Sequence, residues 1–169
     1  MRLFGTALVI AGLLSGHIAA AQCVRPDDSS AFEVTGLKTR LMVTALTCQV
    51  DSKYNEFVTR YKPQLTNEDR NLNSYFSRLN SRSSAKMRDD YVTQLANSES
   101  QVGTRQGTLF CSHNLPIFDE VMALRDGTEL VSYAAAKSVE QPAGIGGCQA
   151  TSATTAARAT TKTTTRRRR

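Results

Sequence analysis

The sequence predicts an all-α protein, an irregular bundle of about five or six helices stapled by two disulfides and followed by a disordered basic tail. Apolar residues recur at three- and four-residue spacing through most of the chain, which is the period of an amphipathic helix. No stretch alternates convincingly with period two, and runs of β-branched residues are scarce. The four cysteines all follow an N-terminal segment typical of export, so we expect them to be oxidised.

Residues 1–21 have the layout of a secretory signal peptide. A basic residue follows the first Met, residues 3–14 are almost wholly apolar, and three consecutive alanines precede Gln22. The apolar run is well short of the roughly 20 residues that cross a bilayer, so we expect no transmembrane segment after cleavage. The sequence therefore predicts cleavage between Ala21 and Gln22 and an exported protein, periplasmic or extracellular.

Residues 22–150 have the length of one domain, and its first two helical patterns are clear. Ser29 or Ser30 can cap the first helix, after a polar lead-in that contains Pro26. Its apolar face comprises Phe32, Val34, Leu37, Leu41, Ala45 and Cys48. The second pattern, which Pro63 interrupts, comprises Tyr54, Phe57, Val58, Tyr61 and Leu65.

A third helix is expected from Thr66, which can cap it, with Glu68 and Asp69 placing negative charge in the first turn. Its apolar face comprises Leu72, Tyr75, Phe76 and Leu79. A turn over residues 80–84 separates it from a fourth helix. That helix carries Met87, Tyr91 and Leu95, and Gly103 and Gly107 weaken its end.

The last helices are shorter. Residues 109–111 are apolar and suit either a strand or a helix. Ser112 or Asn114 can cap a helix with Pro116 in its first turn, and its buried face comprises Phe118, Val121, Met122 and Leu124. Asp126-Gly127 stops it, Thr128 can cap a short final helix, and residues 144–147 form a flexible link into Cys148.

Four cysteines allow three disulfide connectivities. We expect Cys48–Cys111, because Cys48 closes the apolar face of the first helix and Cys111 ends an apolar run. Cys23–Cys148 would then join the two ends of the domain. Local pairing, Cys23 with Cys48 and Cys111 with Cys148, is the main alternative.

Residues 151–169 contain only Thr, Ala, Ser, Arg and Lys, and we expect them to be disordered because they offer nothing large and apolar to bury. All 15 acidic residues lie between Asp27 and Glu140. Residues 22–150 carry fourteen Lys and Arg, a net charge of −1, whereas the tail has six basic residues and no acid. The expected contacts to an anionic surface are Arg158, Lys162, Arg166, Arg167, Arg168 and Arg169. In an exported protein such surfaces are lipid head groups or acidic polysaccharide, and nucleic acid is the weaker partner.

No catalytic, metal-binding or cofactor-binding residue is predicted. His113 is the only histidine of the mature chain, and a single His supplies no site by itself. Cysteine pairs at metal-ligand spacing, phosphate loops and nucleophile motifs are absent from the sequence. The paired carboxylates at residues 27–28, 68–69, 89–90 and 119–120 are interpreted as solvated charge, and the aromatic residues as core.

These observations favour a non-enzymatic exported protein that acts through interaction at the cell envelope, with its tail as an electrostatic tether. Two alternatives remain open. One is a small-ligand-binding helical domain, which a cavity between helices would favour. The other is an enzyme whose dispersed site leaves no motif, which a pocket with perturbed titratable groups would favour.

Overall fold

The computed structural model describes residues 22–142 and 145–147, and within these ranges six helices pack around one another beside a pair of short strands. The elements are, in chain order, β1 (Gln22–Val24), α1 (Pro26–Cys48), α2 (Asp51–Arg60), α3 (Lys62–Leu79), α4 (Ser84–Gln106), α5 (Leu109–Ala123), α6 (Gly127–Lys137) and β2 (Ile145–Gly147). The predicted all-α class and number of helices are confirmed for the described part of the chain.

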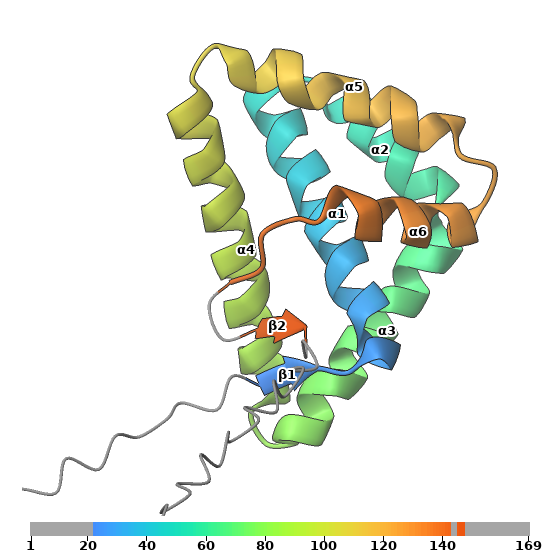
Figure 1. Ribbon diagram of the computed structural model, residues 1–169, viewed down its shortest axis with the longest axis vertical. Helices are drawn as coiled ribbons and strands as arrows, with labels where there is room; N and C mark the ends of the chain where they lie inside the picture. Colours follow the sequence, from blue (N-terminus) through green and yellow to red (C-terminus); the bar gives the residue numbers. More distant parts are fainter. Residues whose placement is uncertain (1–21, 143–144, 148–169) are drawn as a thin grey trace, which may run out of the picture.

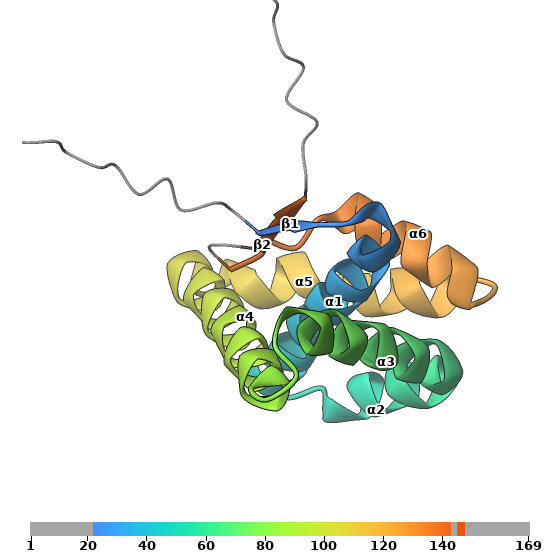
Figure 2. The same cartoon turned by 90° about the horizontal axis from the view of Figure 1, so that it is seen from below.

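Helix α1 is the central element of the bundle. It contacts each of the other five helices, and Figures 1 and 2 show it crossing the middle of the molecule. Its buried residues therefore cover most of its circumference and include Thr35, Thr39 and Thr44. The narrow apolar face predicted from the sequence is only part of the surface that α1 buries.

The core consists of two clusters along α1. The C-terminal half of α1 packs against α2, α5 and α6 through residues that include Leu41, Phe57 and Phe118. The N-terminal half packs against α3 and α4, where the ring of Phe32 lies 4.9 Å from that of Tyr75 and 5.3 Å from that of Tyr91, both edge-on. Edge-on pairs of this kind add to the stabilisation from buried area. The interpretation of the aromatic residues as core is thus confirmed for these rings.

Two helices begin earlier than expected because each starts with a proline in its first turn. Helix α1 begins at Pro26 instead of after Ser29 or Ser30, and α3 begins at Lys62 with Pro63 next to it. The missing N–H of proline costs nothing there, since the first N–H groups of a helix have no partner within it. Thr66 does not cap α3, and its hydroxyl donates to the carbonyl of Lys62 inside the helix.

Pro116 lies inside α5, where a position in the first turn was expected. An interior proline costs about 3 kcal/mol, because it removes a helical hydrogen bond and crowds the preceding turn. The helix continues because Ile117, Phe118 and Val121 follow Pro116 and are buried, each contributing about 1.5–3 kcal/mol.

The residue that caps α6 is Asp126 instead of Thr128. The Asp126 carboxylate accepts hydrogen bonds from the backbone N–H groups of Thr128 and Glu129.

The strands β1 and β2 bring the two ends of the described chain together. They pair in parallel, with Cys23 opposite Gly146 and Val24 opposite Gly147. Residues 145–147 are therefore a strand, and the flexible link predicted there is wrong for them. The pair lies toward the end of the molecule where α3 is followed by α4 (Figure 1).

The pairing of Cys23 with Cys148 stays a prediction, because Cys148 lies outside the described residues. The register places Gly147, which immediately precedes Cys148, opposite Val24, the residue after Cys23. Peptide mapping without reduction is expected to yield one cross-linked peptide that contains both cysteines. Two free thiols at these positions would contradict the prediction.

Candidate functional site

One disulfide lies within the described residues and joins Cys48, at the end of α1, to Cys111, in the first turn of α5. The two Cα atoms are 5.7 Å apart, within the normal range for this bond. This predicted pairing is confirmed, and it excludes the local alternative, in which Cys48 would bond Cys23. The bond fixes the central helix to the helix that covers its C-terminal end.

The six basic residues proposed for the tail, Arg158 to Arg169, lie outside the described residues. His113 is exposed on α5. No group of three or more His, Cys, Asp or Glu side chains that could hold a metal ion occurs among the residues that the structure describes. Within the same ranges no helix has the length and apolar character needed to cross a membrane.

Two carboxylates interpreted as solvated charge are buried. Glu68 is 3% exposed and accepts hydrogen bonds from Ser30, Gln64 and Asn71, which come from α1 and α3. Asp28 is 7% exposed and pairs with Arg78. The interpretation as solvated charge is therefore wrong for both. The reason for Glu68 is that α3 begins at Lys62, which moves this residue from the first turn to the interior.

A buried ion pair joins α1 to α4. The guanidinium of Arg40 donates to both carboxylate oxygens of Glu99, at 3.0 Å and 3.3 Å. The Glu99 side chain is 2% exposed and that of Arg40 is 20% exposed. Glu99 thus has almost no contact with water, and the two hydrogen bonds from Arg40 compensate its charge.

Residues 138–142, which we call the strap, cross from the end of α6 toward β2. Val139 is buried against Gly36 of α1, and a Cβ at Gly36 would come within 2.9 Å of the Val139 Cβ. The Gln141 carboxamide accepts from the Tyr91 hydroxyl at 2.8 Å and donates to the carbonyl of Val139 at 3.2 Å. These contacts fix the strap on α1 and α4.

Burial shifts the pKa values of Glu33 on α1 and Tyr91 on α4. It raises the pKa of Glu33, whose Oε2 atom is buried without a hydrogen-bond partner. Burial also raises the pKa of Tyr91, and the nearby charge of Glu33 raises it further. Both shifts favour the protonated form, and the Tyr91 hydroxyl donates its hydrogen bond to Gln141.

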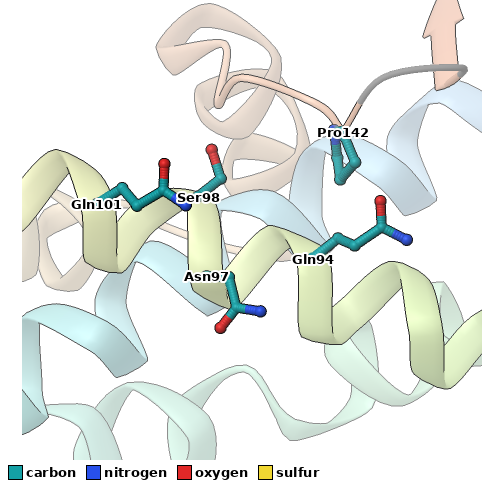
Figure 3. Close-up of a pocket in the computed structure, with 5 residues that line it drawn as sticks. All are labelled: Gln94, Asn97, Ser98, Gln101 and Pro142. Carbon is teal, nitrogen blue, oxygen red and sulfur yellow. The ribbon is translucent and has the colours of Figure 1, made fainter.

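A groove runs along α4 beside the strap. Its lining comprises Gln94, Asn97, Ser98, Gln101 and Pro142, and its volume is about 370 Å³. Figure 3 shows Gln94, Ser98 and Gln101 on the side of α4 that faces Pro142, with Asn97 turned away from it. The carboxamides of Gln94 and Gln101 and the hydroxyl of Ser98 can donate and accept hydrogen bonds, but these groups supply neither a nucleophile with its base nor a charge.

The sequence analysis did not single out this groove. Gln94, Ser98 and Gln101 follow the spacing of one helix face, but exposed helix faces are ordinarily polar and the spacing alone indicates no site. The opposite wall, Pro142, comes from a segment more than forty residues along the chain. Only the packing of the strap brings the two walls together.

Comparisons with models of protein families, with curated proteins and with solved structures find no match to this chain.

Proposed function

We propose that this is an exported, non-enzymatic accessory protein of the cell envelope, held at anionic surfaces by residues 151–169. The observation that carries the proposal is the separation of charge along the chain. Residues 22–150 are close to neutral, whereas the last nineteen residues carry six positive charges and no negative one. Attraction to an anionic surface would therefore reside in the tail and leave the bundle free to contact something else.

The disulfide supports export. A Cys48–Cys111 bond persists in an oxidising compartment and is rare where glutathione keeps thiols reduced.

The charge balance predicts that deleting residues 151–169 removes binding to anionic surfaces and leaves the bundle intact. Each basic residue near an anionic membrane contributes about 1 kcal/mol, and the attraction fades within a Debye length of about 8 Å at physiological salt. Sedimentation with vesicles containing anionic lipid should show salt-sensitive binding of the full chain and none of the truncated chain. Circular dichroism and thermal melting of the two proteins should agree closely.

A matched control keeps the length of the tail and replaces its six Arg and Lys residues by Gln. This variant should behave like the truncated chain. If it binds as well as the original chain, the charge account is wrong, and unfolding of the truncated protein would show that the tail is structural. Failure of the full chain to bind anionic vesicles even at low salt would overturn the proposal.

The groove on α4 favours a second candidate function, a domain that binds a small uncharged ligand.

A further inference from the structure

We propose that the groove between α4 and Pro142 is a binding site for a neutral oligosaccharide. The lining supports an uncharged ligand, because none of its five side chains carries a charge. A carboxamide both donates and accepts hydrogen bonds, and so does a sugar hydroxyl, so the two groups complement each other in either direction. A charged ligand would bind more tightly to a lining of opposite charge, which these five side chains do not supply.

The shape of the groove suits an elongated ligand. Gln94, Ser98 and Gln101 occupy successive turns on one side of α4, over about 10 Å of helix. Pro142 gives an apolar ring opposite these polar groups (Figure 3), and sugar rings likewise present C–H faces beside their hydroxyls. The groove has a volume of about 370 Å³ and is open to solvent, so a bound ligand would remain partly exposed.

The backbone of each wall is anchored in the bundle, whereas the side chains of Gln94 and Gln101 are exposed. Helix α4 is anchored to α1 by the Arg40–Glu99 pair. Pro142 follows Gln141, whose side chain is held by the Tyr91 hydroxyl and by the carbonyl of Val139. Binding would therefore order the side chains of Gln94 and Gln101 but not the backbone that carries them, which limits the loss of conformational entropy.

The site lies on the bundle and is separate in sequence from the tail. The proposal that this site meets envelope glycans in the cell rests on the proposed export. The binding of a neutral oligosaccharide to the groove does not depend on export. A neutral glycan and an anionic surface would then occupy different parts of the same chain.

The test is a titration of the full chain with two neutral tetrasaccharides, one of glucose and one of N-acetylglucosamine, followed by ¹H–¹⁵N NMR. We expect saturable shifts at residues 94–101 and at the side-chain amides of Gln94 and Gln101 with at least one of them. The double variant Gln94→Ala/Gln101→Ala should weaken that binding about tenfold, because two hydrogen-bonding amides are lost. Alanine favours helix, so the variant should fold.

The matched control is Asn73→Ala, which removes an exposed carboxamide from α3 and should leave the affinity unchanged. The truncated chain without residues 151–169 should also bind the tetrasaccharide normally, which separates this proposal from that for the tail. The proposal for the groove would be overturned if neither sugar shifted residues 94–101. It would also be overturned if the double variant bound the sugar as tightly as the original chain. Shifts at these residues with a neutral peptide but with neither sugar would also overturn it.

Discussion

Removal of the Cys48–Cys111 disulfide is expected to lower the free energy of unfolding by about 4 kcal/mol. The bond closes a loop with a sequence separation of 63 residues, and the entropic model gives about this value for a loop of that size. For a domain of this size the loss corresponds to a fall of roughly 10–20 °C in the melting temperature. The double variant Cys48→Ala/Cys111→Ala, compared with the original chain by urea denaturation, measures the effect.

Reduction of the original chain is not an equivalent experiment, because it would also break a Cys23–Cys148 bond. The double variant isolates the bond between α1 and α5. Adding a reductant to this variant then reports any stabilisation from the second pair. A double variant as stable as the original chain would show that packing alone holds α5 on α1.

Replacement of Arg40 by Met is expected to destabilise the bundle by about 3–5 kcal/mol. The substitution keeps most of the side-chain volume but leaves the Glu99 carboxylate, 2% exposed, without its cation. Glu99→Leu should cost somewhat less, because the Arg40 side chain is 20% exposed and keeps some access to water. Chemical denaturation of both single variants measures these costs.

The double variant Arg40→Met/Glu99→Leu should be more stable than Arg40→Met. Replacing both partners of a buried pair removes the uncompensated charge, which is the main source of the cost. The control is Asp90→Asn, which breaks the exposed Lys86–Asp90 pair within α4 and should cost less than about 0.5 kcal/mol. If Arg40→Met lowers the free energy of unfolding no more than this control does, the burial of Glu99 does not depend on its ion pair with Arg40.

The helical class and the main buried positions could be predicted from the sequence because they depend on local periodicity. The faces with Phe57, Leu72, Tyr91 and Leu95 show the three- and four-residue spacing directly, and all four are buried. Helix ends were less predictable. A proline indicates either the first turn or a break, and only the packing of the residues that follow decides between them, as Pro63 and Pro116 show.

The arrangement of polar groups could not be predicted, since it depends on contacts between distant segments. In the sequence, Glu99 is one of several charged residues in the segment that forms α4. It is buried because α4 packs on α1, where Arg40 pairs with it. The environment of Gly36 likewise depends on the strap more than a hundred residues later. The charge of the tail, in contrast, is a property of composition and needs no structure.

The central claim is that an exported helical body is held at an anionic surface by its basic tail. Fractionation of the native cells, expressing either the full chain or a chain ending at Ala150, tests it most directly when combined with mass spectrometry of the recovered protein. Both chains should begin at Gln22 or its cyclised form. The full chain should sediment with the envelope and be released by salt, and the shorter chain should appear in the soluble exported fraction. A protein that retains residues 1–21, or a full chain that stays soluble at low salt, would contradict the account.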